Sequence, residues 1–102
     1  MPTTTTLNDP DFRLLSQRKL DEDTRIRHQQ YRRIAGLAVA IEEWVWDGIV
    51  GHSVIFLSRD IAGWTDDGLK AFMRDNGIDV GEVITASRRD GFVFLNYKFS
   101  AL

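Results

Sequence analysis

The chain has 102 residues, a net charge of −2 and no cysteine. Its length suits one domain with one hydrophobic core, and 43% apolar with 27% charged residues allow that core to form in a soluble protein. The lack of cysteine excludes disulfide bonds, thiol catalysis and cysteine-bound zinc, and it favours a cytoplasmic location. The acidic balance excludes a protein that grips any phosphate backbone, and no apolar stretch is long enough to span a membrane.

The N-terminal part is predicted to be a flexible tail over residues 1–8, followed by a single α+β domain over residues 9–102. Asn8 or Asp9 can cap a helix that continues from residue 11 to about residue 19. Whether residues 9–47 form one helix or two is left open by the pattern.

A long helix is predicted from about residue 24 to residue 47. Apolar residues recur at helical spacing, and Asp47-Gly48 gives a typical helix end. The apolar stripe comprises Tyr31, Ile34, Ala38, Ile41 and Val45.

The second half predicts a strand over residues 52–58, a helix over residues 66–76, and strands over residues 80–87 and 92–99. Thr65 followed by two aspartates marks the helix start, and Asp90-Gly91 is a strong hairpin signal. The expected fold class is therefore α+β: a long N-terminal helix (about 24–47), then strand-helix-strand-strand with a small antiparallel sheet of about three strands.

Local signatures of catalysis are absent from the sequence. There is no glycine-rich phosphate loop, no nucleophile elbow and no zinc-protease motif, and the only histidines are His28 and His52. We expect no cofactor, no metal and no catalytic residue. An enzyme whose site is assembled only in space remains a third alternative.

The last strand carries aromatic residues at alternate positions, with Phe92, Phe94 and Asn96 on one face. The run Gly91-Phe92-Val93-Phe94-Leu95-Asn96-Tyr97 resembles the octapeptide of the RNA recognition motif family. Upstream, Ile55-Phe56-Leu57 is similar to that family's shorter strand motif, so the resemblance covers roughly residues 53–99. It implies that Phe56, Phe92 and Phe94 stack on bases. The alternative is that these rings are ordinary core.

A basic run, Arg25 to Arg33, contains four arginines and no acid. On a helix, Arg25 and Arg32 would lie two turns apart with Gln29 between them, a spacing that suits phosphates or an acidic protein surface. Trp46 would point toward the polar side of the helix, as an interface tryptophan. Self-association through this helix predicts a homodimer.

We therefore expect a small non-enzymatic, inhibitor-like adaptor that acts through a protein or nucleoprotein partner in the cytoplasm and is carried by a phage or plasmid. The alternative is an RNA or single-stranded nucleic-acid-binding module that uses the aromatic strands and the basic helix. The candidate partner-binding residues are Arg25, Gln29, Arg32, Arg33, Trp46, Phe56, Arg88, Arg89, Phe92 and Phe94.

Overall fold

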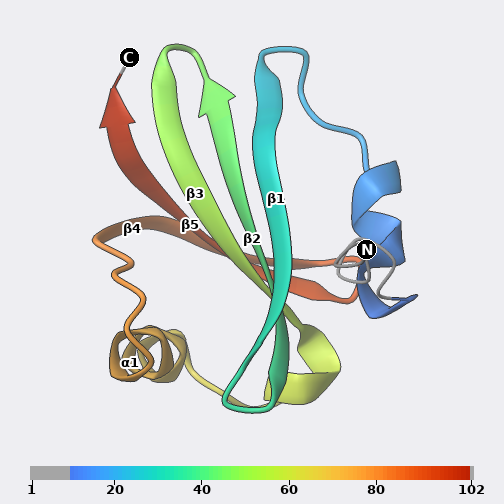
Figure 1. The fold of residues 1–102 in the computed structure, drawn as a ribbon, viewed down its shortest axis with the longest axis vertical. Helices are drawn as coiled ribbons and strands as arrows, with labels where there is room; N and C mark the ends of the chain where they lie inside the picture. Colours follow the sequence, from blue (N-terminus) through green and yellow to red (C-terminus); the bar gives the residue numbers. More distant parts are fainter. Residues whose placement is uncertain (1–9, 102) are drawn as a thin grey trace, which may run out of the picture.

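The computed structural model describes residues 10–101 and places most of them in one antiparallel sheet (Figure 1). Within these residues the sheet has five strands in the order β1-β2-β3-β5-β4, so β1 and β4 are its edges. The elements are a 3-10 helix η2 (Pro10–Gln17), β1 (Thr24–Ile34), β2 (Leu37–Trp46), β3 (Ile49–Leu57), a 3-10 turn η3 (Ser58–Ile61), α1 (Asp66–Asp75), β4 (Glu82–Arg89) and β5 (Phe92–Ala101).

The predicted fold class is wrong, because residues 24–46 form two strands of the sheet instead of a long helix. The chain reverses at Ala35-Gly36, at Asp47-Gly48 and at Asp90-Gly91, and all six residues have positive φ angles. Two consecutive residues with positive φ make the tight turn that matches the twist of a hairpin. Asp47-Gly48 is therefore a hairpin turn and not a helix end, and Gly36 separates two strands.

The apolar stripe predicted for the long helix does not exist as one surface. Tyr31 faces one side of the sheet with Ala40, whereas Ile34 faces the other side with Val39. Apolar residues on both faces of two adjacent strands reproduce a helical spacing by coincidence, and β-branched and aromatic residues favour the strands. The homodimer expected through that helix therefore has no such helical surface to use.

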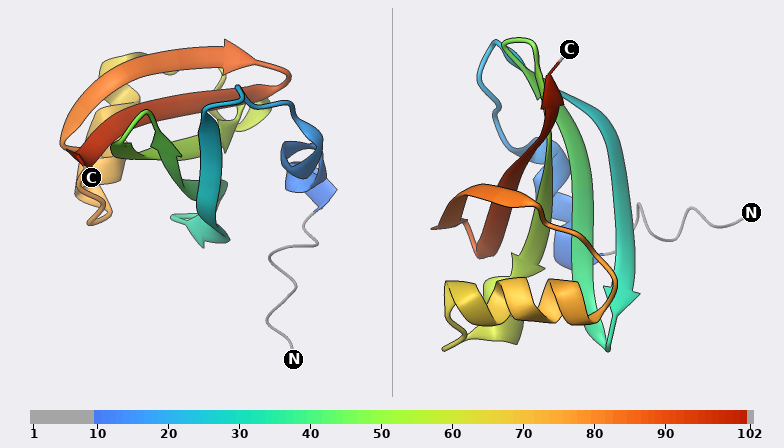
Figure 2. Two further views of the ribbon diagram at one scale, coloured as in Figure 1. Left: turned by 90° about the horizontal axis from the view of Figure 1, so that it is seen from above. Right: turned by 90° about the vertical axis from the view of Figure 1, so that its left-hand side faces the viewer.

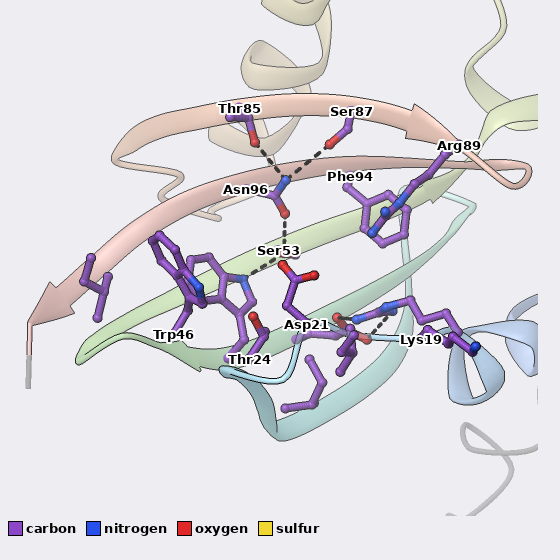
Figure 3. A pocket seen from close by; sticks show the side chains of 16 residues that line it. Lys19, Asp21, Thr24, Trp46, Ser53, Thr85, Ser87, Arg89, Phe94 and Asn96 are labelled. Carbon is purple, nitrogen blue, oxygen red and sulfur yellow. Dashed lines mark hydrogen bonds and ion pairs between the residues drawn. The ribbon is translucent and has the colours of Figure 1, made fainter.

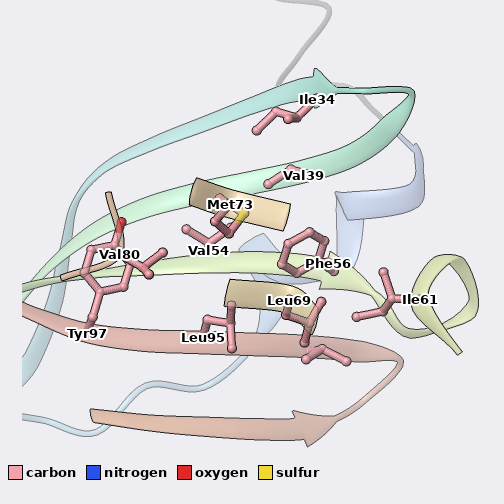
Figure 4. Packing of buried hydrophobic residues seen from close by; sticks show 11 residues of the cluster. Ile34, Val39, Val54, Phe56, Ile61, Leu69, Met73, Val80, Leu95 and Tyr97 are labelled. Carbon is pink, nitrogen blue, oxygen red and sulfur yellow. The ribbon is translucent and has the colours of Figure 1, made fainter. Parts of the chain in front are cut away.

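Different elements pack against the two faces of the sheet. The helix face, with Val39, Val54, Phe56 and Leu95 at its centre, is covered by Leu69 and Met73 of α1 (Figure 4). The opposite face carries Ala40, Glu42, Ile55 and Asn96, and we call it the pocket face. Figure 2 shows α1 and η2 on different sides of the curled sheet.

The pocket face is covered only in part. Phe12 and Leu15 of η2 pack on the end of the face that holds Tyr31 and Phe92, and the ring centroids of Phe12 lie 5.3 and 5.8 Å from those of these two residues. The other end of the pocket face has no such helix over it within residues 10–101 (Figures 1 and 2). No helix in the described part of the chain combines the length and apolar character required to cross a membrane.

Candidate binding pocket

A row of polar side chains crosses the pocket face at the border between its covered and open ends. Each of the five strands supplies one residue, and neighbouring residues are register partners. We call this set the polar row; in strand order it comprises Gln29, Glu42, Ser53, Asn96 and Thr85.

Hydrogen bonds connect most of the polar row. Ser53 Oγ donates to Asn96 Oδ1 at 2.5 Å, and Asn96 Nδ2 donates to Thr85 Oγ1 at 2.9 Å. Asn96 Nδ2 also lies 3.4 Å from Ser87 Oγ, farther along the edge strand. Because the amide of Asn96 is held from both ends, its oxygen and nitrogen have fixed orientations in the floor of the face.

Glu42 is the buried charge of the row, with 1% of its side chain exposed. Its two carboxylate oxygens accept hydrogen bonds from Arg18 Nη1 and Nη2 at 3.0 and 2.5 Å, and Oε2 also accepts one from Gln29 Nε2 at 2.6 Å. A carboxylate at this depth requires a cation and hydrogen-bond donors to be tolerated. The pair ties the chain after η2 to β2, and it leaves Arg18 Nε buried without a hydrogen-bond partner.

Trp44 lies flat on the sheet because its cross-strand partner is Gly51. A Cβ atom at Gly51 would overlap Trp44 Cη2, so only glycine leaves room for the indole. In this position Trp44 Nε1 donates to Ser53 Oγ at 2.9 Å. The tryptophan ring thus forms a wall beside the polar row.

The open end of the pocket face is hollowed into a pocket of about 520 Å³ (Figure 3). Drug-sized ligands and small side-chain groups occupy cavities of this size. The end toward the β2–β3 turn is aromatic and aliphatic, with Trp44, Trp46, Ile26 and Ile49, and the floor carries the hydroxyl groups of Ser53, Thr85 and Ser87. Trp46 is 45% exposed at the rim, and Leu20 is 39% exposed.

The opposite end of the pocket is cationic. The guanidinium carbons of Arg18 and Arg89 lie 5.5 and 5.3 Å from the centroid of the Phe94 ring, within the range of cation–π attraction. Arg18 is neutralised by Glu42, but no ion pair is found for Arg89 among the side chains that the structure describes. Lys19 and Asp21 also line the pocket, and Figure 3 shows the Asp21 carboxylate directed into it.

A second polar cluster lies on the helix face and involves Glu43. Its two carboxylate oxygens face Arg27 Nε at 3.0 Å and His52 Nε2 at 3.5 Å, and the His52 ring lies 5.7 Å from that of Tyr97. Burial raises the pKa of Tyr97 above its usual value, and the charge of Asp79 adds to this effect.

Within residues 10–101, no group of three or more acidic or histidine side chains is arranged to hold a metal ion.

Four of the predicted site residues come together on the pocket face. Gln29 belongs to the polar row, Trp46 and Arg89 border the pocket, and Phe94 lies beneath Arg89 with 5% of its surface exposed. Phe92 is on the same face, but Phe12 covers its ring. The two phenylalanines are therefore core residues of this face and are not open to bases.

Phe56, Arg88, Arg25 and Arg32 lie on the other face of the sheet. Phe56 is fully buried under α1, where its ring contacts that of Phe72 at 6.1 Å between centroids. Arg88 lies on the helix side of β4 and pairs with Asp66 at 2.7 Å. Arg25 and Arg32 are exposed on the helix face of β1, on the other side of the strand from Gln29, because side chains alternate in a strand and do not follow helical spacing.

Arg33 is exposed and takes a position on the pocket face, opposite Ala38 in the neighbouring strand. It does not line the pocket, since this register position lies at the end that η2 covers.

The sequence interpretation missed Arg18, Glu42, Ser53 and Asn96 as members of one site. The alternation of Phe92, Phe94 and Asn96 is the one local signal, because it places a polar residue at the end of an aromatic face. The contacts of Glu42 depend on pairing β1 with β2, which the helical interpretation excluded.

Comparisons with protein-family models, with curated proteins and with solved structures find no significant match to this chain.

Proposed function

We propose that this chain is a non-enzymatic binding protein that acts through a protein partner, and that the pocket receives side chains of that partner. The observation that carries the proposal is the open aromatic end of the pocket face. Trp46 and Leu20 stand exposed at the rim of a preformed hollow of about 520 Å³. Tryptophan and arginine beside a pocket are the residue types that dominate protein–protein binding energy.

The polar groups of the polar row, at the floor of the pocket, support binding more than catalysis. The carboxylate of Glu42 is neutralised by Arg18 and accepts a hydrogen bond from Gln29, and the amide of Asn96 is held by its neighbours on both sides. A general acid or base needs a group that is free to exchange a proton with a substrate. These groups fix the shape of the floor instead.

The nucleic-acid alternative has less support on the same face. The rings of Phe92 and Phe94 are buried, and Arg25 and Arg32 lie on the other side of the sheet. Stacking requires exposed rings next to phosphate-binding cations. The resemblance to the RNA recognition motif stays a prediction, and an RNA adduct is one possible outcome of crosslinking at the pocket.

A cytoplasmic location, an inhibitor-like role and an origin in a phage or plasmid belong to the same proposal. The absence of cysteine supports the cytoplasmic location. The other two rest on the small size of the chain and its lack of local catalytic motifs.

The experiment that tests the proposal places a photo-reactive phenylalanine analogue at Leu20 or at Leu14 of the full chain. Both leucines are exposed, but only Leu20 lines the pocket. After irradiation in cells that carry the protein naturally, we expect a discrete, protease-sensitive adduct from Leu20 and none from Leu14. A nuclease-sensitive adduct, equal adducts from both positions or no adduct from Leu20 would overturn the proposal.

A further inference from the structure

The pocket is graded from an aromatic end to a cationic end, and this gradient defines the kind of segment that fits it. Trp44 and Trp46 form the aromatic end, and Arg89 is a cation at the other end, with no ion pair found for it among the described side chains. From this arrangement, and resting on the proposed function, we infer that the partner contributes an extended acidic segment, with an apolar side chain against the tryptophans and a carboxylate on Arg89.

The length of that segment follows from the register of the sheet. Arg89 lies over the Phe94 ring. In the register of the sheet, Phe94 of β5 is opposite Ile55 of β3, and Ile55 is opposite Ala40 of β2. Trp44 is four residues farther along the same strand. At about 3.3 Å per residue the two ends are about 13 Å apart along the strand direction, so an extended segment that runs parallel to the strands spans them with its apolar and acidic residues about four positions apart.

Charge along the pocket restricts where the acid can lie. Among the described residues, the acids that line the pocket are Asp21 and Glu42, and Glu42 is already paired with Arg18. Asp21 is exposed and its carboxylate is directed into the pocket (Figure 3). A carboxylate in the middle of the segment would meet Asp21, whereas one at the far end meets Arg89. Repulsion at one position and attraction at another together give positional specificity.

The test is a nuclear magnetic resonance titration of the full chain with short acetylated and amidated serine peptides. One probe carries phenylalanine and glutamate about four positions apart, the second carries them about two positions apart, and the third replaces the glutamate by lysine. We expect the first probe to bind about tenfold more tightly than either of the others, because only its carboxylate reaches Arg89 while staying away from Asp21.

Variants assign the effect to residues. Arg89→Glu is expected to abolish the preference for the first probe over the lysine probe, whereas Arg88→Glu, its neighbour on the helix side of β4, keeps it. Asp21→Asn is expected to reduce the difference in affinity between the first and second probes, because it removes the repulsion and leaves the contact with Arg89 to the first probe. Equal binding of the acidic and lysine probes by the unchanged chain, or an unchanged preference in Arg89→Glu, would overturn the inference.

The binding function and the acidic segment can fail separately. A protein adduct at Leu20 together with no preference for acidic probes removes the acidic segment and keeps the binding function. No adduct and no probe binding remove both.

Discussion

The two faces of the sheet solve the problem of burial in different ways. On the helix face, α1 packs against the sheet and the covered side chains are almost entirely apolar. On the pocket face, η2 covers only one end, and the polar row marks where apolar packing stops. Buried apolar area stabilises a fold without selecting a partner, whereas fixed polar groups beside exposed tryptophan select a partner and add little to stability. We therefore assign stability to the helix face and to the end of the pocket face that η2 covers, and binding to the open end of the pocket face.

The largest expected effect breaks the helix face. Phe56→Ala removes a fully buried ring that contacts Phe72 of α1. Loss of its transfer free energy and the cavity left behind should lower the free energy of unfolding by about 3–5 kcal/mol. Urea denaturation followed by circular dichroism measures it. A loss below about 1 kcal/mol would mean that the helix face is not the stabilising core.

The next effect concerns the buried ion pair that Glu42 of the polar row forms with Arg18. Glu42→Leu leaves Arg18 partly buried without its anion, and should lower the free energy of unfolding by about 3 kcal/mol. The double variant Arg18→Met/Glu42→Leu should recover most of the loss, since no charge remains unpaired. A double variant as unstable as the single one would show that the unpaired charge of Arg18 is not the cause of the loss.

A smaller effect sharpens the difference between packing and binding. Gly51→Ala places a methyl group where the Trp44 ring lies and should displace the indole from Ser53. Overpacking of this kind destabilises by about 1–3 kcal/mol. The binding free energy of the first peptide probe should fall by more than the free energy of unfolding, because the Trp44 ring that forms the wall of the pocket moves. Gly51→Ala combined with Trp44→Ala should regain stability but not binding, and recovery of both would contradict the role given to Trp44.

The smallest effect is a pH dependence on the helix face. Burial raises the pKa of Tyr97 in the folded chain above its ordinary value of 10.0. At a pH between the ordinary and the raised pKa, unfolding therefore releases a proton. The stabilisation is present below about pH 10 and is lost as the pH rises through the raised pKa. Tyr97→Phe should flatten the fall in unfolding free energy between about pH 9 and about pH 11. An identical fall in the variant would assign it to other groups.

Turn chemistry and helix capping were readable from the sequence where they were local. The helix that begins after Thr65 lies at Asp66–Asp75, with Thr65 Oγ1 accepting from the Gly68 amide at 3.0 Å, and the hairpin at Asp90-Gly91 is present. The first two hairpins were missed because Asp47-Gly48 serves equally as a helix end, and because apolar residues on both faces of β1 and β2 imitate a helical stripe. The polar row was missed for the same reason, because Gln29 and Glu42 meet only when β1 and β2 pair.

The central claim is that the open end of the pocket face binds the partner and contributes little to stability. It is tested most directly by measuring the yield of the Leu20 adduct in Trp46→Ala and in Trp64→Ala. Both tryptophans are exposed, but Trp64 packs on Phe72 beside α1 and not on the pocket. We predict that Trp46→Ala removes the adduct and changes the unfolding free energy by less than about 0.5 kcal/mol, whereas Trp64→Ala retains the adduct. Equal yields in the two variants, or loss of the adduct only in Trp64→Ala, would contradict this claim.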